Sequence, residues 1–171
     1  MDSETWVELL KAPGEACKAP GVYLIRWVKE GRPVPIPRIL DVDRKGILYI
    51  GSAKNLRRRL RRLVRALDVE GLEKPSNRRK HTAALTYRFF GLNEHICLKL
   101  GEMEAAWVYF ESVEKARNQE IAAIRHYTEK YGEAPPLNRQ IARMTEPEEE
   151  LDPRLAQLIN CLKKGQGTDY L

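Results

Sequence analysis

The sequence predicts an α+β fold, with a small central antiparallel sheet of about three strands flanked by helices and a short helical extension at the C-terminus. Two apolar runs beside glycines have the length of strands, "GVYLIRWV" at 21–28 and "ILYIG" at 47–51. A third run, "EAAWVYF" at 104–110, supplies another strand. Two longer stretches, 55–67 and 111–131, repeat apolar residues at helical spacing.

The N-terminal third contains one predicted helix and one long excursion around the first strand. Residues 3–11, "SETWVELLK", have the pattern of a short helix capped by Asp2 or Ser3, and the prolines and glycines that follow end it. Prolines at 33, 35 and 37 cannot donate hydrogen bonds to a central ladder. We therefore expect an extended loop or an edge excursion between the first two strands.

The remaining elements follow from capping and periodicity. Asn55 is a suitable N-cap for a helix that ends near Leu67, and 68–80 forms a polar loop. "HTAALTYRFF" at 81–90 predicts a short helix and "HICLKL" at 95–100 a strand. Gly132 should end the 111–131 helix, and "DPRLAQLINCLKK" at 152–164 predicts a last helix with Pro153 in its first turn.

These elements divide the chain into three parts. Residues 1–18 form an N-terminal helix and linker, 19–140 form the main domain, and 141–171 form an acidic linker and a C-terminal helix. A chain of 171 residues is long enough for one domain with its own core.

Composition excludes several classes of protein. No run approaches the roughly 18 apolar residues of a membrane span, and the acidic N-terminus lacks a signal-peptide pattern, so we expect a cytoplasmic protein without a membrane partner. Cys17, Cys97 and Cys161 are odd in number and far apart, which argues against a disulfide framework or a zinc site. We expect these cysteines to be small buried thiols.

Positive charge is concentrated in one helix. The net charge is +6 and the pI is near 9.3, which suits a polyanionic partner. Seven basic residues and no acid lie between positions 54 and 65, whereas 146–152 is a block of acids. The arginines point away from an apolar stripe, except Arg59, which lies at its border and should emerge beside the sheet. The basic face is either a phosphate-binding surface or a solvated face without a partner.

Glu120 falls in the middle of the apolar stripe of the 111–131 helix. An unpaired carboxylate there costs several kcal/mol or takes up a proton, so it needs a partner. Arg117, three residues earlier on the same helix, is one candidate. A divalent cation is the other, and helical geometry leaves both open.

Together these residues resemble the GIY-YIG nuclease family, over residues 19–138. "PGVY" at 20–23 resembles the first signature, with Val22 in place of the usual isoleucine, and "LYIG" at 48–51 is the second signature. Arg59 stands where the family keeps a catalytic arginine, Glu120 where it keeps a metal-binding glutamate, and Asn138 where an asparagine closes the motif. His81 resembles the histidine or tyrosine that some members carry.

The resemblance implies a metal-dependent endonuclease that hydrolyses nucleic-acid phosphodiester bonds, with DNA as the expected substrate and a single Mg²⁺ or Mn²⁺ as cofactor. It implies that Tyr23 acts as the base, that Tyr49 orients the attacking water, that Arg59 stabilises the phosphate, that His81 shares in proton transfer and that Glu120 holds the metal. Expected nucleic-acid contacts are Gly51, Ser52, Lys54, Arg57, Arg58, Arg61, Arg62, Arg65 and Asn138.

Two features depart from the family pattern, and they keep other functions open. The stretch between Tyr23 and Tyr49 is longer than the usual hairpin, so 29–46 is an insertion. The segment after Asn138 is short and partly acidic, whereas members that select a DNA target carry larger additions. The alternative function is a binding module of the same fold with weak or no catalytic activity. A basic protein-interaction domain is a third interpretation.

Overall fold

A computed structural model describes residues 5–68, 82–138 and 149–160. Within these residues the main sheet has five strands, all paired antiparallel. The central strand β2 (Gly21–Lys29) lies between β6 (Ile47–Ala53) and β7 (Met103–Tyr109). The short strands β1 (Val7–Glu8) and β3 (Arg32–Pro33) pair with β7 and with the end of β2. The predicted α+β class and the three predicted central strands are confirmed.

The register places the two signature tyrosines on one face of the sheet. Tyr23 of β2 lies opposite Gly51 of β6 on one side and Trp107 of β7 on the other. Tyr49 of β6 lies opposite Ile25 of β2, two residues along each strand from the Tyr23–Gly51 pair. Because side chains alternate between the faces of a strand, Tyr23, Tyr49 and Gly51 share a face.

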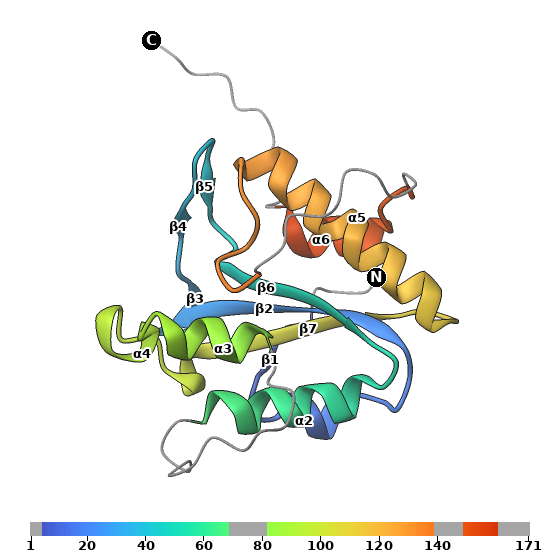
Figure 1. The fold of residues 1–171 in the computed structure, drawn as a ribbon, viewed down its shortest axis with the longest axis horizontal. Coiled ribbons are helices and arrows are strands. Elements are labelled where there is room, and N and C mark those ends of the chain that lie inside the picture. The colour runs from blue at the N-terminus through green and yellow to red at the C-terminus, as the bar shows by residue number, and fades with distance from the viewer. Residues whose placement is uncertain (1–4, 69–81, 139–148, 161–171) are drawn as a thin grey trace.

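Helices cover both faces of the sheet (Figure 1). One face carries α1 (Ala12–Glu15), α2 (Leu56–Leu67), α3 (Thr82–Phe89) and α4 (Leu92–His95), and its buried residues form one core with Tyr23 and Tyr49. The opposite face carries α5 (Val113–Tyr131) and α6 (Pro153–Ile159), which pack on Val22 and Leu24 in a second core. A turn of 3-10 helix, η1 (Leu100–Glu102), precedes β7.

The two long helices begin and end where capping chemistry predicts. The Asn55 side chain accepts a hydrogen bond from Arg58 N at the start of α2, and the leucines at 56, 60, 63 and 67 are buried. Ser112 caps α5 in the same way, and Gly132 ends it in the left-handed region at φ 81°. On α5 the predicted apolar stripe is buried, except for Val113, which is half exposed in the first turn.

The proline-rich insertion forms a separate two-stranded ribbon of β4 (Ile36–Pro37) and β5 (Val42–Asp43). Asp43 is fully buried at its base, where its carboxylate accepts hydrogen bonds from the Lys45, Gly46 and Ile47 amides and from the Tyr127 hydroxyl. The edge excursion expected from the prolines is therefore present. Its base is attached to α5.

Three local predictions are wrong. Residues 3–11 do not form a helix over the part described, because Val7 and Glu8 pair with the edge of β7 and the first helical turn begins at Ala12. Residues 95–100 do not form a strand, because α4 runs to His95 and Cys97 adopts a positive φ of 55°, which breaks an extended run. Cys17 and Cys97 are exposed, not buried, and Cys161 lies outside the described residues.

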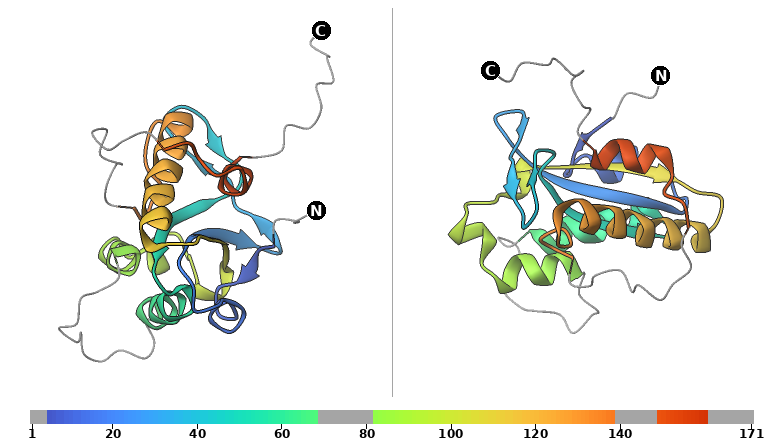
Figure 2. Two further views of the ribbon diagram at one scale, coloured as in Figure 1. Left: turned by 90° about the vertical axis from the view of Figure 1, so that its right-hand side faces the viewer. Right: turned by 90° about the horizontal axis from the view of Figure 1, so that it is seen from above.

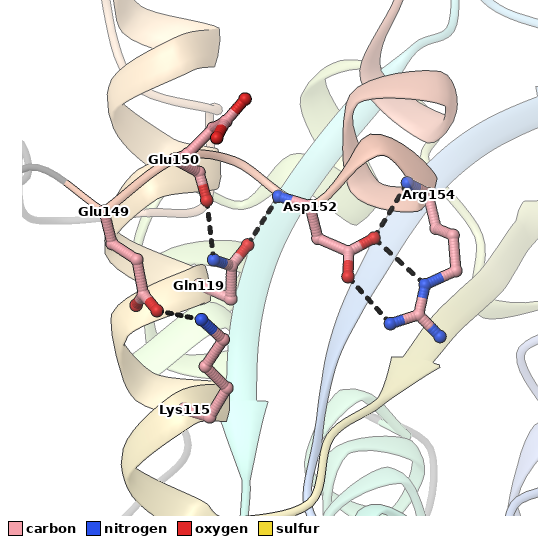
Figure 3. A network of polar contacts seen from close by, with 6 residues as sticks. All are labelled: Lys115, Gln119, Glu149, Glu150, Asp152 and Arg154. Atoms are coloured by element: carbon pink, nitrogen blue, oxygen red, sulfur yellow. Dashed lines mark hydrogen bonds and ion pairs between the residues drawn. The ribbon is translucent and has the colours of Figure 1, made fainter.

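The segment 149–160 packs against the domain (Figure 3). Gln119 of α5 is buried, and its amide donates to Glu150 O at 2.8 Å and accepts from Asp152 N at 2.7 Å. Lys115 pairs with Glu149 one turn earlier on α5. Three apolar side chains of α6 complete the second core, those of Leu155, Leu158 and Ile159. No described helix is long and apolar enough to cross a membrane.

Candidate active site

The two signature tyrosines form a pair directly over Gly51. Their ring centroids lie 5.8 Å apart at an interplanar angle of 45°. A Cβ added at Gly51 would lie 2.5 Å from Tyr49 Cε1 and 3.1 Å from Tyr23 Cζ, closer than packed carbon atoms allow. Glycine is therefore required there by the two rings. The resemblance had implied a nucleic-acid contact at Gly51, whose small size the packing of the rings already explains.

Glu120 reaches this pair from α5, and its partner is Ser52. Ser52 Oγ donates a hydrogen bond to Glu120 Oε2, and the Ser52 amide also donates to the carboxylate. Both side chains are half-buried. Within the described residues Arg117 forms no ion pair with Glu120 and acts on it only at longer range. The structural ion pair considered from the sequence is therefore absent, and Ser52 occupies that role.

Arg59 completes the group from α2 on the other side of the sheet. Its side chain is exposed, and its positive charge lowers the pKa of Tyr23, Tyr49 and Glu120. A charge acts on all three groups only when it lies close to each of them. Two strands and the helices of both faces thus place two phenols, a carboxylate and a guanidinium within electrostatic range of one another around β2 and β6.

Burial opposes ionisation at each acidic group of the site. Burial raises the pKa of Tyr23, which is 0% exposed, well above its ordinary value. Burial raises the pKa of Tyr49, which is 9% exposed, to about 12. Burial also raises the pKa of Glu120, against the opposing effects of Ser52 and Arg59. The site therefore disfavours negative charge until a cation enters it.

Exposure distinguishes the two phenols, which also interact with each other by a hydrogen bond. Tyr23 is fully buried, whereas Tyr49 retains some exposed surface. This geometry favours Tyr49 as the phenol that meets a water molecule, with Tyr23 behind it. The resemblance implied the opposite order, with Tyr23 as the base.

The donor set suits a hard divalent cation. Glu120 supplies a carboxylate, with hydroxyl oxygens of Ser52 and Tyr49 close by. Mg²⁺ takes oxygen ligands, keeps several waters and needs only one or two protein carboxylates beside a phosphate. Within residues 5–68, 82–138 and 149–160 no group of three or more His, Cys, Asp and Glu side chains comes together. A cation at Glu120 would therefore depend on water and substrate for its other ligands.

The basic face of α2 is exposed, but the N-terminus of the helix is already satisfied. The Leu56 and Arg57 amides donate to the Ala19 and Cys17 carbonyls, and the Arg58 amide donates to Asn55. These amides are not open to a phosphate, contrary to the expectation that a helix N-terminus would bind one. Phosphate binding therefore depends on side chains, and those exposed to solvent on and before α2 are Lys54, Arg58, Arg59, Arg61, Arg62 and Arg65.

Three predicted contacts have other surroundings. Arg57 is half-buried, and its Nε donates to Ala16 O at 2.7 Å. Asn138 uses both ends of its amide on the Ile50 backbone, at 2.9 and 2.8 Å, and the Leu137 amide donates to Leu48 O beside it. These contacts cover the outer edge of β6 and give Asn138 a structural role. His81 lies outside the described residues.

Sequence reasoning missed two buried polar residues that hold the site's elements in place. Gln119 fixes the α5 turn next to Glu120, and nothing in the local sequence indicates its contacts to residues 150 and 152. Asp43 fixes the start of β6, and here a signal exists. An aspartate three residues before a glycine, as in "DRKG" at 43–46, is typical of a turn that the carboxylate stabilises.

Searches against protein-family models, curated proteins and solved structures return no match to the chain.

Proposed function

We propose that this protein is a divalent-metal-dependent endonuclease that hydrolyses phosphodiester bonds of nucleic acid, with DNA as the substrate, as a member of the GIY-YIG type. The observation that carries the proposal is the convergence of Tyr23, Tyr49, Arg59 and Glu120 around β2 and β6. A structural role alone gives no reason to bring a half-buried carboxylate beside two buried phenols, because each raises the free energy of ionising the others.

Arg59 binds the scissile phosphate and stabilises the negative charge that develops on it. A guanidinium remains charged at any physiological pH and offers several donors to phosphate oxygens. Because Arg59 is exposed, its guanidinium can reach the sugar-phosphate backbone of a bound nucleic acid. Because it also lies near the phenols, it holds the phosphate next to the reacting water. The exposed arginines along α2 bind further phosphates of the same strand or of its complement.

Glu120 holds the metal ion, and Ser52 positions Glu120. A divalent cation bound at this carboxylate would neutralise charge on the phosphate and on an ionising phenol. Ser52 fixes the carboxylate with two hydrogen bonds, one from its hydroxyl and one from its amide. Ser52 is therefore a positioning residue in this proposal, whereas the resemblance implied a nucleic-acid contact there.

Tyr49 orients the attacking water and accepts its proton, and Tyr23 lies behind it as its hydrogen-bond partner. The assignment follows from the greater exposure of Tyr49. With a pKa of about 12 in the free protein, a value that already includes the lowering by Arg59, Tyr49 is protonated at neutral pH. Its action as a base would therefore need the further positive charge of a bound metal ion.

The test is a cleavage assay with end-labelled nucleic acids of different form: single-stranded, duplex, branched and mismatched DNA, and the matching RNAs. Each is incubated with the protein with and without Mg²⁺. We expect Mg²⁺-dependent internal cuts with DNA, reduced by Tyr49→Phe and less by Tyr23→Phe. Binding to the panel without any cut at any Mg²⁺ concentration would contradict the proposal and favour the binding module of the same fold.

A further inference from the structure

The ribbon of β4 and β5 ends in a turn that presents two large apolar side chains to solvent. Ile39 is 71% exposed and Leu40 is 66% exposed, the highest values for large hydrophobic residues in the part of the chain that the structure describes. Arg38 N donates to Asp41 O across the turn. We refer to residues 38–41 as the ribbon tip.

The ribbon tip is held in place from below. The Leu40 amide donates to Tyr131 O at 3.1 Å, and Arg38 donates to Ala134 O and pairs with Glu133 at 3.2 Å. The buried Asp43 fixes the base of the ribbon to Tyr127. Prolines at 33, 35 and 37 limit the backbone of the same excursion. These contacts fix the turn against the C-terminal end of α5, where the two apolar side chains lie beside Gly132 with most of their surface still exposed.

The exposed area suits a small occupant. Two adjacent side chains expose at most a few hundred Å², whereas a stable protein partner covers about 800 Å² on each side. Isoleucine and leucine are among the side chains that proteins insert between base pairs, where one or two of them unstack a single step. The size of the tip therefore favours a base step over a second protein surface.

Charge and position favour the same occupant. The excursion 29–46 holds five basic and three acidic residues, so it is basic overall although the exposed Asp41 lies in the tip itself. Beside the tip, Glu133 is neutralised by Arg38. In Figures 1 and 2 the ribbon stands beside the C-terminal end of α5. The tip packs on Gly132, and Glu120 lies about 18 Å earlier along the same helix at 1.5 Å per residue. That span corresponds to roughly five base pairs of duplex.

We propose that the ribbon tip is a wedge that inserts Ile39 and Leu40 into a base step of double-stranded nucleic acid, about five base pairs from the phosphate bound at the candidate active site. The proposal rests on the proposed function for the position of that phosphate. The wedge makes the protein respond to how easily a step unstacks, so a mismatch or a branch at that step strengthens binding and a stable step weakens it.

The test uses duplexes that carry the fluorescent base 2-aminopurine at successive positions, measured in EDTA so that no cleavage occurs. The parent protein should raise the fluorescence severalfold at one step, about five base pairs from the cut mapped separately with Mg²⁺. The double variant Ile39→Ser/Leu40→Ser should melt as the parent does and lose this rise. The control Leu10→Ser/Ile96→Ser, which changes two exposed apolar side chains elsewhere, should keep it.

Equal fluorescence for the parent and the wedge variant would overturn the proposal. So would a parent that sediments as a dimer and a wedge variant that sediments as a monomer, since the tip would then contact a second copy. Failure of the proposed function looks different: the fluorescence rise persists in EDTA, but no substrate is cut when Mg²⁺ is added.

Discussion

The exposed arginines of α2 predict how strongly nucleic-acid binding depends on salt. Arg58, Arg61 and Arg65 are exposed, lie on the polar side of the helix and belong neither to the site nor to the core. If each neutralises one phosphate of a duplex, it contributes about 0.9 to the slope of log affinity against log salt. Replacing all three with glutamine should therefore flatten the slope by about 2.7 and leave the fold intact.

The assay is fluorescence anisotropy of a labelled duplex in EDTA at several salt concentrations between roughly 50 and 200 mM. Thermal melting of the same variant should be nearly unchanged, because Arg58 in the first turn opposes the helix dipole whereas Arg65 in the last turn favours it. A control variant replaces three exposed lysines on other elements, Lys11, Lys29 and Lys99, with glutamine. An unchanged slope for the arginine variant, or equal flattening in the control, would refute the assignment of the basic face.

Three further outcomes follow from the geometry. Gly51→Ala should disrupt the phenol pair and lower activity and stability, because its Cβ would meet Tyr49 at 2.5 Å. The control Gly14→Ala, whose Cβ would have no atom within 4 Å, should be neutral. Similar melting and activity of the two variants would contradict this prediction. Deleting 149–171 should cost about 4.5–9 kcal/mol, since three buried aliphatic side chains contribute about 1.5–3 kcal/mol each. Chemical denaturation that matches the parent would show the segment to be dispensable. Without a divalent cation Tyr49 should ionise near pH 12, seen as the part of an absorbance titration that Tyr49→Phe removes. Because its pKa is raised in the folded protein, stability should fall as pH rises from its ordinary value of 10 to about 12, and should fall less in Tyr49→Phe, where the other buried tyrosines still contribute.

Local chemistry allowed much of the fold to be predicted from the sequence. Asn55 and Gly132 mark helix ends by capping, and the leucine stripe of α2 fixes which face is buried. These features depend on neighbours within a few positions. The helix predicted at 3–11 failed because β1 forms by pairing with β7, which lies almost a hundred residues along the chain. A two-residue edge strand leaves no periodicity of its own.

The contacts that define the site were less predictable for the same reason. The position of Glu120 on an apolar stripe showed that it needs a partner, but helical spacing could suggest only Arg117. The partner, Ser52, comes from β6, and only the packing of α5 on the sheet places it there. Likewise, which of the two phenols is more exposed depends on the helices that cover them. The sequence could therefore identify the two tyrosines but not how far each is buried.

The most direct test of the central claim is single-turnover cleavage by the parent and by Glu120→Gln as Mg²⁺ is titrated, with melting and EDTA binding measured on both. Burial raises the pKa of Glu120 in the folded protein, so the stability that its protonated form contributes is lost as pH rises through the pKa. The neutral glutamine can still accept a hydrogen bond from Ser52. The Glu120→Gln variant should therefore melt at the same or a higher temperature than the parent at pH 7. Binding should survive, and cleavage should fall by at least on the order of a hundredfold. A variant that melts earlier, yet cleaves with the parent's rate and Mg²⁺ dependence, would show that Glu120 is a structural residue and would contradict the account of this protein as a metal-dependent nuclease.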